Sequence, residues 1–351
     1  METERQGMAR QQRLPRTVNA ALFITALTWA IAANLIATKA AQGISGRFQL
    51  APILAVLQAS FLLFLLVVGL RGLDWIATKG RFAGEVLPLP ARKGRAREWG
   101  IGFALGWGMV LAGALPVLVA GYLHAQPELT GRNLGACAVA LIVLALVSLA
   151  EEVIFRGYAL QRLAGVIGIS AGAVLMSVVF AAFLIFADPP RSLRNALIDG
   201  LLFGLLLTMA YLRTRGLWLG WGLHFGYRAV AAVIIGLPIA GHGELPSLMN
   251  TTTSGPRWLS GGAYGLDATL WAGAVLLIAM AVLYRVTREY AWSYTHAPII
   301  AAGHEVTIAP PAAHVAMEKT AAPPPLVQIL SSTPQTRSVV PVDPEQDMTG
   351  Q

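Results

Sequence analysis

The stretch Ser148-Leu-Ala-Glu-Glu-Val-Ile-Phe-Arg-Gly-Tyr158 places two carboxylates and a guanidinium late in an apolar run that extends from about 134 to 163. On the insertion scale a charged residue near the bilayer centre costs roughly 2.5–3.5 kcal/mol, so three cost roughly 7–10 kcal/mol. The run contains fourteen Leu, Ile, Val or Phe residues. Together they favour insertion into the membrane by roughly 4–8 kcal/mol. Such a helix is marginal as a lone membrane span. We therefore expect other helices to shelter its polar side.

Composition indicates a polytopic α-helical membrane protein. Of the 351 residues, 56% are hydrophobic and 13% are charged, and the mean hydropathy is +0.61. That share of charge is about half of what a soluble domain carries. The net charge of +8 does not indicate a nucleic-acid partner, because the basic residues fall in short loops on alternate sides, as the positive-inside rule predicts. The single cysteine, Cys137, excludes a disulfide framework and a cysteine-based metal site.

The predicted fold class is all-α, a membrane bundle of about eight helices. Each predicted span is long enough to cross about 30 Å of hydrocarbon. The spans cover about 18–38, 51–70, 99–122, 134–163, 168–187, 195–213, 216–239 and 267–286. The connection 71–98 is rich in Arg and Lys and is predicted to be cytoplasmic. Eight spans then place both termini in the cytoplasm, in a multi-pass protein of the cell (inner) membrane that contacts bilayer lipid.

The predicted organisation has three parts. A basic cytoplasmic N-terminus covers 1–17, the membrane domain covers 18–290, and a Pro- and Ala-rich tail covers 291–351. The tail lacks apolar periodicity, so we expect a disordered cytoplasmic segment. The Gly- and Pro-containing stretch 240–266 is predicted to be an irregular external loop.

Away from the span ends, ionisable residues gather in three of the eight predicted spans. The fourth span holds two acids and an arginine, the sixth one acid, and the seventh a histidine and an arginine: Glu151, Glu152, Arg156, Asp199, His224 and Arg228. A polar locus shared among helices predicts a reaction site or a transport path. The structural alternative is an ion-pair network that only fixes helix packing. Asp199 lies near the external end of its span, where we expect it to serve as an interfacial cap or turn residue.

Helical spacing suggests how these side chains divide their roles. Glu152 and Arg156 are four residues apart with the acid first, the orientation that pairs well. Glu151 points about 100° away from Glu152, which leaves it free to act as a base on water. His224 and Arg228 are also four apart, so both could present donors to a developing oxyanion.

Three features carry a resemblance to a known family. Glu151-Glu152-Val-Ile-Phe-Arg156-Gly-Tyr fits an E-E-x-x-x-R motif. Tyr211-Leu-Arg-Thr-Arg-Gly-Leu-Trp218, leading to Gly222-Leu-His224-Phe, fits the approach to a final histidine. Together with the order and number of spans, these stretches resemble the CPBP (also called ABI) intramembrane endopeptidases, which include the type II CAAX prenyl proteases. The resemblance covers roughly 100–240.

The resemblance implies an integral membrane endopeptidase that hydrolyses a peptide bond in a membrane protein or peptide. It implies that Glu151 activates water, that Glu152 and Arg156 hold the site, and that His224 helps to bind the oxyanion. In its metalloprotease form it also implies a divalent metal such as zinc, for which Glu151 and His224 are the candidate ligands. One histidine and two acids make a poor zinc set when one acid is committed to an arginine.

Two positions depart from the family pattern. The second motif, F-x-x-x-H, here is Phe180-Ala-Ala-Phe-Leu184, with leucine at the histidine position. The third motif, H-x-x-x-N or H-x-x-x-D, here is His224-Phe-Gly-Tyr-Arg228. Arg228 could replace asparagine as an oxyanion donor. It could instead pair with Glu151 and disable that base.

These departures keep a second function open, a catalytically inactive relative that binds or scaffolds another membrane protein. A small-solute transporter is less favoured, because the sequence shows no paired interrupted helices in corresponding halves.

Overall fold

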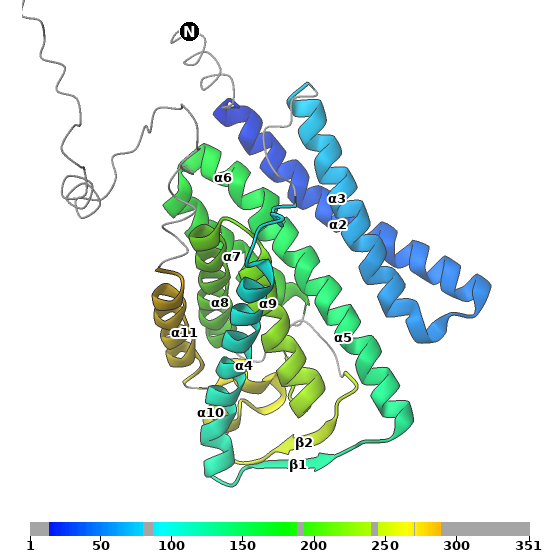
Figure 1. The fold of residues 1–351 in the computed structure, drawn as a ribbon, viewed down its shortest axis with the longest axis vertical. Coiled ribbons are helices and arrows are strands. Elements are labelled where there is room, and N and C mark those ends of the chain that lie inside the picture. Colours follow the sequence, from blue (N-terminus) through cyan, green and yellow to red (C-terminus); the bar gives the residue numbers. More distant parts are fainter. Residues whose placement is uncertain (1–13, 80–86, 188–192, 240–244, 270, 289–351) are drawn as a thin grey trace, which may run out of the picture. The chain divides into compact units, whose positions relative to one another are not determined.

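The computed structural model describes residues 14–79, 87–187, 193–239, 245–269 and 271–288. They form the helical unit in Figure 1 and all lie before Thr295, where the first compact unit of the chain ends. The predicted tail 291–351 and most of the basic N-terminus 1–17 lie outside the described residues.

The first two helices form an antiparallel hairpin. They are α2 (Arg16–Phe48) and α3 (Leu54–Ala77), joined by the short 3-10 turn η1 (Ala51–Ile53). Along α2, Ala33, Ala37 and Ala41 are fully buried. Small side chains at this spacing let two membrane helices approach closely, so a stripe of alanines holds the hairpin together.

The middle of the chain forms one long continuous rod, with a helix and a strand before it and a helix after it. These elements are α4 (Arg95–Val119), β1 (Leu123–Pro127), α5 (Gly131–Glu152), the π-helical segment η2 (Val153–Ala159), α6 (Leu160–Ile167) and α7 (Ile169–Ala187). The α5, η2 and α6 segments run on without a break over 37 residues. A π-helical segment widens the backbone and often occurs at functional sites; here it begins directly after the two adjacent glutamates.

The last part of the described chain packs helices against α4 and α7. The elements are α8 (Leu193–Thr214), α9 (Trp218–Arg228), the π-helical η3 (Ala229–Ile235), β2 (Met249–Thr253), α10 (Arg257–Ser260), the 3-10 segment η4 (Gly262–Ala268) and α11 (Ala272–Val286). The largest buried apolar cluster includes Phe155, Phe180, Leu206 and Leu223. It therefore joins the rod to α7, α8 and α9.

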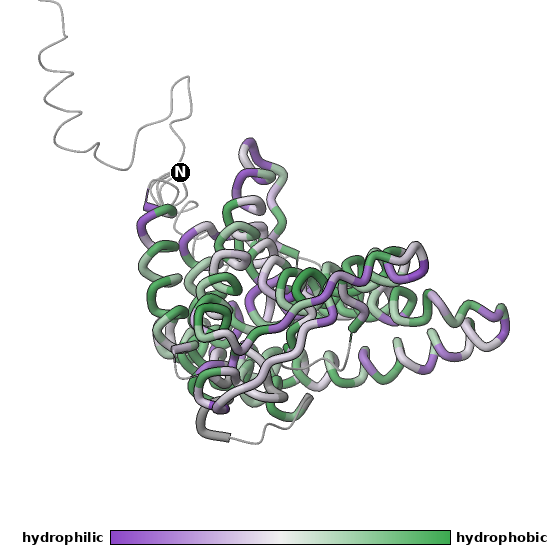
Figure 2. Tube along the Cα trace, turned by 90° about the horizontal axis from the view of Figure 1, so that it is seen from below, coloured by the Kyte–Doolittle hydropathy of each residue, from purple (hydrophilic) through white to green (hydrophobic). Residues whose placement is uncertain are grey.

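Six helices within the described parts are long and apolar enough to cross a membrane, which indicates a multi-pass integral membrane protein. They correspond to the first six predicted spans. In Figure 2 the hydrophobic colour follows the helices and the hydrophilic colour gathers mainly at their ends and turns.

The predicted seventh and eighth spans fall short of that length. The regular helix α9 has 11 residues before it widens into η3, and α11 has 15. The predicted start of the eighth span, at 267, was wrong because the backbone of Gly265 adopts φ 74° and the chain is extended at Thr269.

The predicted irregular loop 240–266 contains regular structure in its described part. Met249–Thr253 pairs antiparallel with Leu123–Pro127, with Ala125 opposite Thr251. The all-α prediction therefore holds for the bundle but missed this two-stranded ribbon. A signal was present, because β2 contains three consecutive threonines, and β-branched residues favour strands.

Candidate active site

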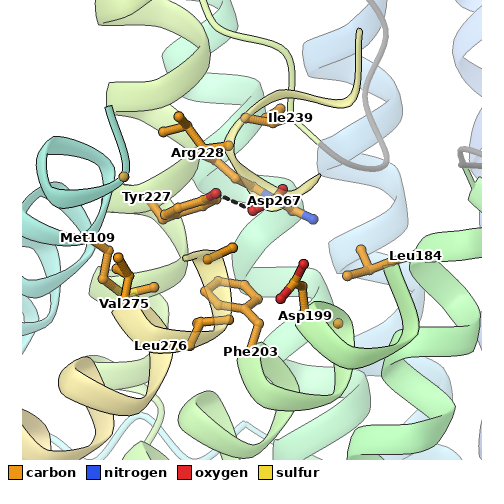
Figure 3. Close-up of a pocket in the computed structure, with 14 residues that line it drawn as sticks. Met109, Leu184, Asp199, Phe203, Tyr227, Arg228, Ile239, Asp267, Val275 and Leu276 are labelled. Carbon is orange, nitrogen blue, oxygen red and sulfur yellow. Dashed lines mark hydrogen bonds between the residues drawn. The ribbon is translucent and has the colours of Figure 1, made fainter. Parts of the chain in front are cut away.

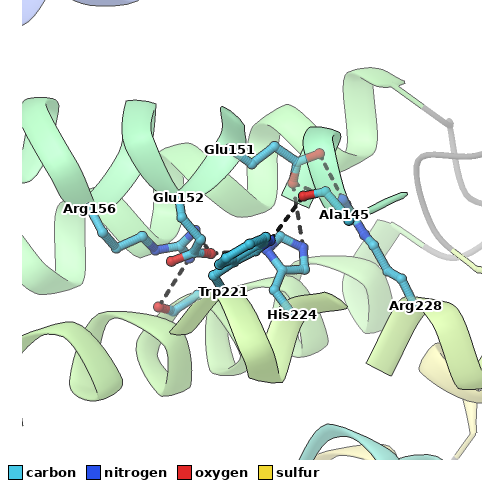
Figure 4. Close-up of polar contacts among 8 residues, drawn as sticks. Ala145, Glu151, Glu152, Arg156, Trp221, His224 and Arg228 are labelled. Carbon is cyan, nitrogen blue, oxygen red and sulfur yellow. Dashed lines mark hydrogen bonds and ion pairs between the residues drawn. The ribbon is translucent and has the colours of Figure 1, made fainter. Parts of the chain in front are cut away.

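The five predicted site residues meet in one buried cluster between the α5–η2 rod and α9 (Figure 4). The rod contributes two acids and an arginine, and α9 contributes a histidine and an arginine: Glu151, Glu152, Arg156, His224 and Arg228. Each is exposed by 6% or less. Two carboxylates and two guanidinium groups lie together, so their formal charges balance in a place where an unpaired charge would be costly.

Contacts between α4 and α9 position the histidine and arginine of α9. Cβ atoms on Gly102 or Gly106 of α4 would overlap backbone atoms of α9, and a Cβ on Gly226 would lie 2.6 Å from the carbonyl oxygen of Phe103. Gly222 lies equally close to α4. Successive residues in a helix are 100° apart, so the side chain of His224 leaves α9 roughly opposite to this glycine face.

This helix contact was not predicted from the sequence, although a signal was present. Both helices carry the small-xxx-small spacing that brings membrane helices together, as Gly102-x-x-x-Gly106 and Gly222-x-x-x-Gly226. On the side facing the rod, Trp221 Nε1 donates a hydrogen bond to the carbonyl oxygen of Ala145 at 2.9 Å. Together these contacts fix the rotation of α9 and direct its polar side chains toward α5.

Glu152 contacts two other members of the cluster, Arg156 and His224. Its Oε1 accepts from Arg156 Nη1 at 3.2 Å and lies 2.9 Å from His224 Nδ1. Arg156 also donates to the carbonyl oxygen of Gly204 at 3.4 Å and lies 4.2 Å from the centre of the Phe180 ring. The pairing of Glu152 with Arg156 agrees with the helical spacing. An ionised carboxylate only accepts, so the bond with Glu152 requires His224 Nδ1 to carry its proton.

Glu151 is not free, contrary to the expectation from the sequence. Nη1 and Nη2 of Arg228 lie 2.9 and 3.0 Å from Oε1 and Oε2 of Glu151, so both carboxylate oxygens accept from one guanidinium. Such bidentate pairs are among the strongest protein hydrogen bonds. Two roles were predicted for Arg228, oxyanion donor or partner of Glu151. In the structure it is the partner of Glu151. His224 Nε2 lies 3.5 Å from Glu151 Oε2.

The second family motif supplies no base or metal ligand here. Leu184 is buried on α7, and Phe180, one turn earlier, packs its ring 6.0 Å from the ring of His224. Within the described ranges, no group of three His, Cys, Asp or Glu side chains is arranged to hold a metal ion. Because Arg228 occupies both oxygens of Glu151, the residues of the cluster do not fit zinc.

Arg228 also lines a cavity (Figure 3). Its wall is mostly apolar and includes Leu184, while its polar part combines acids with a tyrosine and the arginine: Asp199, Tyr227, Arg228 and Asp267. The hydroxyl of Tyr227 donates to Asp267 Oδ1. Asp199 was expected to be a cap or turn residue, but it lies within α8 and lines this cavity. Asp267 was not predicted as a site residue, because it stands at the edge of a predicted span.

A second buried ion pair joins the N-terminal hairpin to the rod. Asp74 Oδ1 accepts from Arg162 Nη2 and lies 3.5 Å from the hydroxyl of Tyr158. The guanidinium of Arg162 also lies over the Tyr158 ring, 4.8 Å from its centre. Asp74 was predicted to lie in the connection after the second span, whereas it is fully buried near the end of α3. Because this ion pair joins α3 to α6, its role is to hold the hairpin against the rod.

One family model matches the chain, that of the type II CAAX prenyl endopeptidase Rce1-like proteins, over residues 133–230. The match runs from α5 to the start of η3 and includes the whole polar cluster and Leu184. No curated protein and no solved structure matches the chain.

Proposed function

Because residues 133–230 form a domain of the Rce1-like type II CAAX prenyl endopeptidase (CPBP) family, we propose that this protein is a catalytically silent membrane relative that binds or scaffolds another membrane protein. One observation carries the proposal. Both oxygens of Glu151 accept hydrogen bonds from Arg228, at 2.9 and 3.0 Å.

Hydrolysis by a glutamate requires a carboxylate oxygen that can take a proton from water. The oxygens of Glu151 are engaged by a guanidinium that keeps its own protons. Leu184 offers no second base, and Glu152 is fully buried against Arg156 and His224. General acid–base catalysis contributes typically about 10²–10⁴-fold to a rate, so a site without an available base loses a contribution of that size.

The second candidate function is the endopeptidase that the family implies, hydrolysing a peptide bond with water activated by Glu151. The position of Arg228 favours this second function, because Arg228 lines the cavity and also forms the ion pair with Glu151. The side chain of Glu151 is also 8% exposed, while that of Glu152 is fully buried. If a substrate drew Arg228 into the cavity, Glu151 would be free beside His224.

Residence in the cell (inner) membrane with both termini cytoplasmic is part of the proposal. Its support is the basic stretch that leads into the first turn of α4, where Arg92, Lys93, Arg95 and Arg97 follow one another closely. Positive residues in short connections favour the cytoplasmic side.

The test uses the purified full chain in lipid nanodiscs and a library of membrane-segment peptides, with and without a prenylated C-terminal CAAX sequence. We expect the wild-type chain to cleave no peptide faster than Glu151→Gln does. We also expect both proteins to bind the same subset of peptides by fluorescence anisotropy. Cleavage by the wild-type chain that Glu151→Gln abolishes would establish the endopeptidase instead, and binding of no peptide would refute the binding role.

A further inference from the structure

Exposed cations gather at the end of the helical unit where α8 and α11 finish and α4 and α9 start. We call this surface the basic end, and its members are Lys93, Arg95, Arg215, Arg285 and Arg288. We propose that the basic end binds the headgroup phosphates of anionic phospholipids. The basic end is separate from the polar cluster, and its binding to phospholipid does not depend on the proposed function.

Hydrogen bonds join the chain segments that carry these cations. Leu217 N donates to the carbonyl oxygen of Pro88 at 2.8 Å, and Trp218 Nε1 donates to that of Pro90 at 3.0 Å. The segment before α4 is therefore bound to the turn between α8 and α9. Arg213 Nε and Nη2 donate to Oγ1 and O of Thr287 at 3.1 and 3.2 Å, which binds the end of α8 to the end of α11. The cations thus share one surface.

Among the residues that the structure describes, the carboxylate nearest to this surface in sequence does not neutralise it. Glu98, in the first turn of α4, is fully buried and accepts from Arg92 Nε at 2.8 Å. Among the carboxylates that the structure describes, that of Glu128 is exposed, but it follows β1 and lies beyond the opposite end of α4. Among the described residues, the charge that the basic end presents outward is therefore positive.

The backbone at Arg215 supports a role for its side chain. Its φ is 48°, in the left-handed region that favours glycine and asparagine over other residues. A Cβ atom on the next residue, Gly216, would lie 3.1 Å from Nη2 of Arg92. Arg215 therefore has a strained backbone, and strained positions of this kind concentrate at functional sites.

The position along the helices identifies lipid as the source of the phosphate. On α11, Leu277 and Ile278 are exposed by 57% and 64%, as expected for a surface against hydrocarbon. The cations Arg285 and Arg288 follow within three turns, where that apolar surface ends, and Tyr284 marks the boundary. Cations directly beyond an apolar band lie at headgroup depth, where anionic lipids attract them.

The experiment measures phosphatidylglycerol bound to the full chain in nanodiscs of phosphatidylcholine with increasing phosphatidylglycerol, by native mass spectrometry. The test variant is Lys93→Gln/Arg95→Gln/Arg215→Gln/Arg285→Gln. The matched control, Lys39→Gln/Arg47→Gln/Arg132→Gln/Arg257→Gln, removes the same charge from exposed positions elsewhere.

At low ionic strength we expect the apparent affinity for phosphatidylglycerol to fall by about fivefold for each cation removed from the basic end, which corresponds to roughly 1 kcal/mol per cation. The control should change it by less than about twofold, because its cations lie outside the proposed surface. Equal losses in both variants, or no preference of the wild-type chain for phosphatidylglycerol, would overturn the proposal. Displacement of the lipid by millimolar glycerol phosphate would overturn it too, because it would identify a general phosphate site.

Discussion

Arg228 of α9 holds Glu151 of α5 by both carboxylate oxygens, across 77 positions of sequence. One turn further along the rod, Arg156 pairs with Glu152. Each of the two adjacent acids therefore has its own guanidinium, and His224 lies between them, 2.9 Å from Glu152 and 3.5 Å from Glu151. This arrangement explains how two neighbouring carboxylates stay buried, because each charge is paired and hydrogen-bonded.

The first prediction concerns the stability of this pair. Arg228→Gln leaves Glu151 buried without its partner, so it should lower the free energy of unfolding by about 3–5 kcal/mol. The double variant Glu151→Gln/Arg228→Gln removes both charges and should recover most of that loss. Thermal unfolding in detergent measures both. Additive losses in the double variant would show that the two side chains do not stabilise each other.

The second prediction concerns the silent site. Leu184→His/Arg228→Asn restores both departures from the family motifs and frees Glu151, so peptide cleavage should rise by about 10²-fold or more over the wild-type chain, as general-base catalysis allows. Leu184→His alone should have little effect, because Arg228 still engages Glu151. A mass-spectrometric assay on membrane peptides measures cleavage. A rise that persists when Glu151→Gln is added would contradict the assigned role of Glu151.

The third prediction concerns the glycine contact that positions α9. Gly106→Ala places a Cβ against the carbonyl oxygen of Leu223 and should cost about 1–3 kcal/mol or more, because a packed backbone has to move. Gly108→Ala is the matched control on the same helix, since no atom lies within 4 Å of its Cβ position. Melting temperatures of the two variants should differ clearly. Equal melting temperatures would mean that α4 and α9 are not in close contact.

The fourth prediction concerns the ion pair between the hairpin and the rod. Asp74→Asn keeps the side-chain shape but leaves Arg162 buried without a counter-charge, which should weaken the attachment of α3 by about 3–5 kcal/mol. In a chain that also carries Ala26→Cys, at a buried position, the introduced thiol should then react faster with a maleimide. Lys79→Gln, an exposed change near the end of α3, serves as the control and should leave the labelling rate unchanged.

Much of the architecture could be predicted from local sequence pattern. Hydropathy identified the membrane class and the six long spans, because burial in lipid selects for runs of apolar residues. The pairing of Glu152 with Arg156 was predictable, because residues four apart share a helix face whatever the surroundings. The concentration of charge in a few spans also predicted that these residues would meet.

The partner of Glu151 depended on tertiary structure. Arg228 was equally compatible with two roles until the rotation of α9 was known, and that rotation comes from backbone contacts at Gly102, Gly106, Gly222 and Gly226. The burial of Asp74 and the pairing of β1 with β2 likewise depend on segments distant in sequence. By itself the sequence determined which residues share a helix and how apolar each helix is, since both follow from neighbours along the chain. Only the packed structure decided which charge faces which, because that depends on the rotation and depth of whole helices against one another.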